Sequence, residues 1–177
     1  MRPNITALLV LTGLTLALWI IAMPVTASAQ EPDLIGNYRD WAAYSVGKGG
    51  SKMCYAATSP KDMKPKGVRR GDVFFLVTHQ PGNDVIGEVS IDTGYPYKKG
   101  ARITGKIGKT TYVLFGQEQR AWLEDAEADR KMIKSLKGGT TLIVTGTSTR
   151  GTVTTDRYSL IGFSAAYKAA TKACNVR

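Results

Sequence analysis

The chain is poor in the side chains on which most metal centres and nucleophilic enzymes depend. It has one histidine, His79, and two cysteines, Cys54 and Cys174, in 177 residues. It contains no G-x-S-x-G nucleophile elbow, no H-E-x-x-H zinc motif and no P-loop. A Ser-His-Asp triad would have to use His79, which ends an apolar run and is expected to be a structural histidine at a strand edge. We therefore expect no enzyme, no metal site and no cofactor.

Long apolar runs are absent after the first 29 residues. Before that point, Arg2 gives a short basic start and residues 5–23 are almost entirely apolar or small. Pro24 interrupts the run, and Ala27 and Ala29 place small residues before Gln30. This order predicts a secretory signal peptide, residues 1–29, and a mature domain of residues 30–177. The alternative is an uncleaved membrane anchor, because about 18 apolar residues can span a bilayer.

Acidic residues are fewer than basic ones, and the formal net charge is +10. Arg2 is the only charged residue in the expected leader, so cleavage leaves +9. Such a charge favours encounter with acidic partners. Export to the periplasm or outer envelope, or secretion, argues against nucleic acid and favours an acidic protein, lipopolysaccharide or a glycan surface. The alternative is that the charge only keeps the domain soluble.

The two cysteines fall in the mature domain. An even count in an oxidising compartment favours one disulfide between Cys54 and Cys174, closing a loop of 120 residues. One alternative is a metal site with both cysteines as ligands, although such a site needs more cysteine or histidine than the chain has. A thiol nucleophile paired with His79 is the other alternative.

Short runs of β-branched and aromatic residues separated by turn residues recur along the mature chain. The expected strands are residues 41–46, 53–58, 73–78, 85–91, 102–107, 111–116, 140–147 and 152–161. Segments 124–137 and 164–173 have helical spacing and are expected to pack on the sheet. This pattern predicts a mainly β single domain, an antiparallel sandwich or barrel-like fold with two short helices.

Two basic clusters are candidate sites for an anionic partner. They comprise Lys61, Lys64, Lys66, Arg69 and Arg70 in a proline-containing loop, and Lys98, Lys99 and Arg102 in a later turn. If the two segments lie at the same end of the domain, they form one docking surface. The alternative is that both are ordinary solvated loops.

A polar stretch near the C-terminus is a second candidate site. On an expected strand, Thr152, Thr154 and Asp156 share one face, with Arg150 at its edge. Such a stripe suits a sugar or a carboxylate, because arginine gives bidentate recognition. The alternative is a solvent-exposed strand face without a ligand, on which Asp156 pairs with Arg150 or Arg157. The opposite face is poorly apolar, which predicts a bulge near Arg157.

A carboxylate pair is the remaining route to catalysis without histidine, as in sugar hydrolysis. The candidate carboxylates are Asp72, Asp84, Glu88 and Asp92. This gives an alternative function, a hydrolase acting on envelope or host glycans.

The order of several short elements resembles a known family. They are an early Trp41, Cys54, Arg70-Gly71, Gly94-Tyr95-Pro96, Trp122, the stretch GTSTRGTVTTDRYSL at residues 146–160, and Cys174. Together they resemble the invasion-associated locus B family of exported bacterial proteins, over essentially the whole mature chain. The resemblance implies an envelope or secreted location and a role in host-cell association or invasion. It implies no catalytic residue and no ligand.

Overall fold

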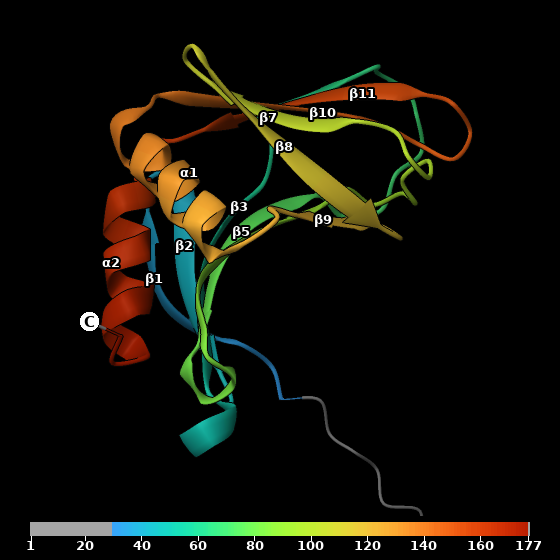
Figure 1. Cartoon of the computed structure of the whole chain (residues 1–177). Coiled ribbons are helices and arrows are strands. Elements are labelled where there is room, and N and C mark those ends of the chain that lie inside the picture. The colour runs from blue at the N-terminus through green and yellow to red at the C-terminus, as the bar shows by residue number, and fades with distance from the viewer. Residues whose placement is uncertain (1–29, 177) are drawn as a thin grey trace, which may run out of the picture.

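The computed structural model describes residues 30–176, which form one open antiparallel sheet with two helices (Figure 1). The expected leader, residues 1–29, lies outside the described residues. In the described part of the chain no helix has both the length and the apolar character needed to cross a membrane.

The sheet has eleven strands within residues 30–176, and their order is β1-β2-β3-β5-β6-β9-β8-β7-β10-β11-β4. The strands are β1 (Asp33–Tyr38), β2 (Trp41–Val46), β3 (Met53–Thr58), β4 (Asp62–Lys64), β5 (Phe74–Gln80), β6 (Val85–Asp92), β7 (Ile103–Ile107), β8 (Thr110–Gln117), β9 (Arg120–Trp122), β10 (Thr141–Thr147) and β11 (Val153–Ser159). The helices are α1 (Ala126–Gly138) and α2 (Phe163–Ala173). The prediction of a mainly β, antiparallel domain with two packed helices is confirmed, and the sheet is not closed into a barrel.

The sheet bends so that its two halves face each other across the core. One half, with β2, β3 and β5, carries α2, while β7, β10 and β11 form the layer at the top of the view (Figure 1). Trp41 lies between the halves: its ring is 4.9 Å from that of Phe163 and 5.9 Å from that of Phe75. Its indole N–H donates to the Ser159 carbonyl at 2.9 Å. This one side chain therefore joins β2, β5, β11 and α2.

Asp125 caps the N-terminus of helix α1, and its carboxylate accepts from the Ala128 N–H at 2.8 Å. A carboxylate at this position satisfies a free N–H group and complements the helix dipole. Met132, Ile133 and Leu136 form its buried face. The predicted helix starts at residue 124, and the structure starts it two residues later because Asp125 is extended and serves as the cap.

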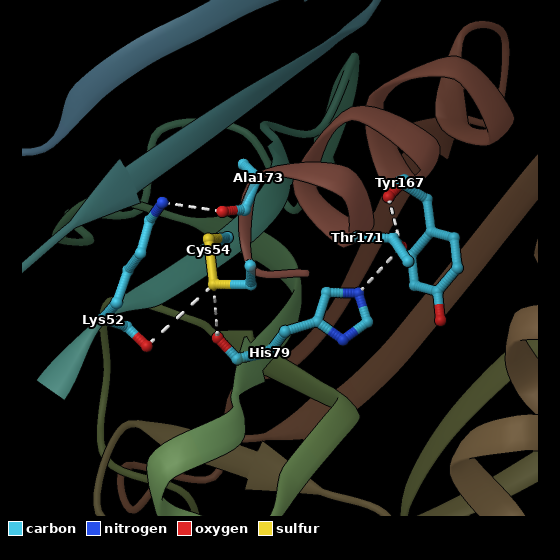
Figure 2. The surroundings of a disulfide bond; sticks show 7 residues. Lys52, Cys54, His79, Tyr167, Thr171 and Ala173 are labelled. Carbon is cyan, nitrogen blue, oxygen red and sulfur yellow. Dashed lines mark hydrogen bonds between the residues drawn. A yellow bond between two sulfur atoms is a disulfide. The ribbon is translucent and has the colours of Figure 1, made fainter. Parts of the chain in front are cut away.

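The disulfide between Cys54 and Cys174 is present, so the predicted pairing is confirmed and neither sulfur is a free thiol. It fixes the end of α2 to β3 (Figure 2). Beside it, the Lys52 ammonium donates to the Ala173 carbonyl at 2.6 Å, where a cation complements the negative end of the helix.

His79 is buried beside the disulfide, next to Thr171 of α2 (Figure 2). The Thr171 hydroxyl donates to the Tyr167 carbonyl at 2.7 Å, so it accepts from His79 Nε2 at 3.1 Å. Burial lowers the pKa of His79, which keeps the ring neutral. His79 therefore has the structural role expected for it, but inside the core rather than at an edge.

Candidate functional site

Three of the short elements that carry the family resemblance, Arg70-Gly71, Gly94-Tyr95-Pro96 and residues 146–160, converge on a buried ion pair. The guanidinium of Arg70 donates to both carboxylate oxygens of Asp156 on β11, each at 2.6 Å. Its Nε donates to the Thr93 carbonyl at 3.1 Å, and its cation lies 5.0 Å from the centre of the Tyr95 ring. The side chains of Arg70 and Asp156 are only 6% and 1% exposed. Bidentate geometry of this kind is what makes a buried pair tolerable.

This pair corrects three predictions. Arg70 is withdrawn from the candidate surface, because its guanidinium points into the core. Thr154 and Asp156 do share one strand face, but that face is buried and offers no exposed polar stripe. The partner of Asp156 is Arg70, not Arg150 or Arg157. The register of β10 with β11 also runs without a shift through Arg157, so the predicted bulge is wrong.

Two glycines bring the Arg70 segment against the Tyr95 segment. The Gly71 N–H donates to the Gly94 carbonyl at 2.9 Å, and Gly94 has φ of +67°. A Cβ at Gly94 would lie 2.4 Å from the Gly71 carbonyl oxygen, so only glycine fits. Tyr95 then reaches Thr154, with 2.6 Å between their hydroxyl oxygens. The Arg-Gly and Gly-Tyr-Pro elements are thus parts of one packed junction.

Gly94→Ala is expected to destabilise the fold more than Gly100→Ala. Both glycines have a left-handed φ, +67° and +74°, so each replacement costs roughly 1–2 kcal/mol of backbone strain. Nothing lies within 4 Å of a Cβ at Gly100, whereas at Gly94 the clash with Gly71 adds roughly 1–3 kcal/mol. Urea unfolding of both variants checks this. Equal losses would show that the Gly71–Gly94 contact does not matter.

The turn between β10 and β11 is fixed to the same junction. The Thr149 N–H donates to the Pro96 carbonyl at 2.9 Å, and the Lys98 N–H donates to the Thr147 carbonyl at 2.8 Å. Within the turn, the Ser148 hydroxyl accepts from the Thr152 N–H at 3.2 Å. Arg150 at the tip is exposed and its guanidinium approaches the Arg69 carbonyl at 3.4 Å. The residue 60–70 loop, the residue 93–102 loop and this turn therefore meet at one end of the domain.

That end, called here the basic end, carries the exposed cations of all three segments: Lys64, Lys66, Arg69, Lys98, Lys99, Arg102 and Arg150. Lys66 pairs with Asp62, and the other six make no ion pair with a carboxylate in residues 30–176. The condition set by the sequence, that the two basic segments lie together, is met. Arg150, which the sequence placed with the polar stretch of Thr152, Thr154 and Asp156, belongs to the basic end instead. Thr152 lies half-buried in the turn.

Lys61 is directed elsewhere. Its ammonium binds the Asp40 carboxylate at 2.6 Å, and the hydrogen bond lowers the pKa of Asp40. The same effect of Lys66 lowers the pKa of Asp62. These two lysines offer less free charge than their positions in the sequence indicate.

A second feature is a hollow of about 710 Å³ between β6 and the start of α1. Of the candidate carboxylates, Asp84 and Glu88 line it, while Asp92 instead pairs with Arg120 at 3.2 Å and Asp72 is exposed in the segment that follows Arg70. Asp129 also lines the hollow and is not among the carboxylates predicted from the sequence. Its position in the sequence could have revealed its burial: Asp129 precedes Met132 by three residues and Ile133 by four, which places it on the apolar face of the predicted helix.

Asp129 is 8% exposed and accepts from the Val89 N–H at 3.0 Å. Burial raises its pKa to about 6, with the nearby Glu88 carboxylate adding to the effect. Phe115 and Trp122 stack in the wall of the same hollow, with ring centres 5.7 Å apart. In residues 30–176 no cluster of three or more His, Cys, Asp or Glu side chains has the arrangement of a metal site.

Comparison with known proteins gives one family. The sequence model described as "Invasion associated locus B (IalB) protein" matches residues 41–171, from Trp41 through the Arg70–Asp156 junction to α2. No curated protein and no solved structure matches the chain significantly. The matched range covers most of the chain, and the chain therefore belongs to the invasion associated locus B (IalB) family.

Proposed function

We propose that this protein is exported, remains in the periplasm or outer envelope or is secreted, and binds an acidic partner through the basic end without catalysing a reaction. The partner class is an acidic protein, lipopolysaccharide or an acidic glycan, and the binding supports host-cell association. Family membership and the disulfide are compatible with export. The proposal carries no cofactor and no metal.

The observation that carries the proposal is the gathering of six cations without ion pairs from three distant segments. The Arg70–Asp156 pair and the Gly71–Gly94 contact hold these segments in place before any partner arrives. A surface organised in advance loses less conformational entropy on binding than free loops would. Surface charges of one sign also accelerate encounter with an oppositely charged partner.

Binding of heparin, a soluble acidic glycan, tests the proposal. The variant R69Q/K98Q/K99Q is expected to bind at least tenfold more weakly, with a shallower dependence on salt. The control K134Q/K168Q/K172Q removes the same charge from the exposed sides of α1 and α2, and should bind within a few-fold of the original protein. Equal weakening of both variants would mean that net charge alone, not the basic end, attracts the polyanion.

The alternative is a glycan hydrolase centred on the hollow beside α1. One observation favours it: Asp129, whose pKa is raised, lies next to Glu88 and near a stacked aromatic pair. Two carboxyl groups with different pKa values divide the acid and base roles in sugar hydrolysis. Product release from a purified envelope glycan, lost in D129N, would support this alternative. Saturable binding with no product release would exclude it for that glycan.

The same variant gives a pH prediction that is independent of activity. Because the pKa of Asp129 is higher in the folded state, at about 6, than its ordinary value of 3.8, stability falls as the pH rises through this range. D129N keeps an acceptor for the Val89 N–H and removes the charge. It is expected to raise the free energy of unfolding at pH 7 by roughly 1–3 kcal/mol, with almost no gain at pH 4. Urea unfolding at both pH values checks this, and an equal gain at both would contradict it.

A further inference from the structure

The outer face of β7, β10, β11 and β4 has an unusual composition. Cross-strand pairing sets one row of Thr104, Thr145, Thr155 and Lys64, and a second row of Lys106, Ile143, Arg157 and Asp62. Paired residues of neighbouring antiparallel strands point to the same side of a sheet. The alternating residues Leu142, Val144 and Tyr158 lie in the core. These two rows, with Val113 and Val153 beside them, are called here the threonine face.

The threonine face is open to solvent. The helices and the other half of the sheet lie on the opposite side of this layer (Figure 1). Lys64, Lys106 and Arg157 are exposed, and they make no ion pair with a carboxylate in residues 30–176. The one acid in the two rows, Asp62, is bound by Lys66. The face is therefore cationic, and it adjoins the basic end through Lys64.

The acids lie elsewhere. Five carboxylates line the hollow beside α1: Asp84, Glu88, Glu124, Asp125 and Asp129. The threonine face is thus cationic, whereas the hollow, which Arg120 also lines, is mainly acidic. Such a division orients a protein near a charged plane, with its cationic side toward negative charge.

The spacing of the cations fits a plane of many anions better than one small anion. Lys106 on β7 and Arg157 on β11 are separated by β10, which places their strands about 10 Å apart. Lys64 on β4 lies one strand further, so the three cations span about 14 Å, more than one phosphate covers. An array of phosphates reaches all three, and the threonine hydroxyls between them are further hydrogen-bond donors.

Exposed apolar side chains distinguish a lipid surface from a soluble polyanion. Val113, Ile143 and Val153 are 53%, 37% and 58% exposed among these cations. Cations and apolar side chains on one face are typical of proteins that lie in a membrane interface. We infer that the threonine face docks on an anionic lipid surface, with Lys64, Lys106 and Arg157 at phosphate-bearing headgroups. This inference rests on the proposed function and names its partner.

Vesicle flotation tests the inference with the mature chain, residues 30–177. Vesicles of mixed phosphatidylglycerol and phosphatidylcholine are expected to bind it, and phosphatidylcholine alone is not. Each cation near an anionic leaflet contributes roughly fivefold, so K64Q/K106Q/R157Q should weaken binding about a hundredfold. The matched control K134Q/K168Q/K172Q should lose no more than a few-fold. Equal losses in the two variants, or no flotation with anionic vesicles, would overturn the inference.

A second variant separates the lipid from a soluble polyanion. I143S/V153S keeps every charge, and is expected to weaken vesicle binding severalfold while heparin binding stays unchanged. Unchanged vesicle binding in I143S/V153S would overturn insertion of the face. Heparin binding without vesicle binding would overturn this inference and leave the proposed function standing, whereas binding to neither probe would remove both.

Discussion

Asp156→Asn is expected to lower the free energy of unfolding by about 3–5 kcal/mol, one of the two largest effects expected in the domain. The amide keeps the shape of the carboxylate but leaves the Arg70 guanidinium, 6% exposed, without a counter-charge. An uncompensated buried cation is far more costly than the loss of one hydrogen bond. Urea unfolding of the variant at neutral pH measures the effect.

Two comparisons separate the buried pair from ordinary ion pairs. Asp92→Asn breaks the exposed pair with Arg120, and should change stability by no more than about 1 kcal/mol. Replacing both partners, as R70M/D156L, removes the stranded charge and should recover much of the loss. If D156N and D92N are equally stable, the buried pair is not what holds the junction.

Removal of the disulfide is expected to have an effect of similar size. C54S/C174S opens a loop of 120 residues, for which chain entropy gives an upper value of about 5 kcal/mol, and we expect a loss of about 3–5 kcal/mol. Cys54 is fully buried and Cys174 is 7% exposed, so the bond should also resist reductant in the folded protein and yield to it in urea. Urea unfolding of the variant and of the oxidised protein measures the stability loss, and thiol titration after reductant, with and without urea, measures the resistance of the bond.

The disulfide variant also separates stability from binding. The bond joins β3 to the end of α2, away from the basic end (Figure 1). Below its unfolding transition, C54S/C174S should therefore bind heparin as the original protein does. A variant that unfolds at the original urea concentration would contradict the stabilising role of the bond.

The sequence predicts those strands in which the side-chain pattern is strong. Residues 41–46 and 53–58 alternate or carry β-branched and aromatic side chains, and the structure has strands with these bounds. Three strands were missed. β4 and β9 have three residues each, and β1 contains Gly36 and Asn37, which favour turns. Pairing with a neighbour, rather than local preference, holds these segments extended.

The sequence could identify the basic segments but not the pair that organises them. Arg70 and Asp156 are 86 residues apart, and nothing local marks either as buried. The poorly apolar outer face of β11 led to the prediction of a bulge near Arg157. The register is regular because Arg70 satisfies Asp156 on the inner face, while Thr155 and Arg157 face solvent. The spacing of residues in the sequence therefore does not predict which charged side chains pair over a long distance along the chain.

Photocrosslinking in living cells, from a photoreactive amino acid at Lys99 in one variant and at Lys168 in another, tests whether the basic end is the binding surface. Both positions are exposed, but only Lys99 belongs to the basic end. We expect capture of an acidic partner from position 99, no such capture from position 168, and loss of the capture when Arg69 and Lys98 are also neutralised. Capture of the same neighbours from both positions would contradict the claim that the basic end is the binding surface.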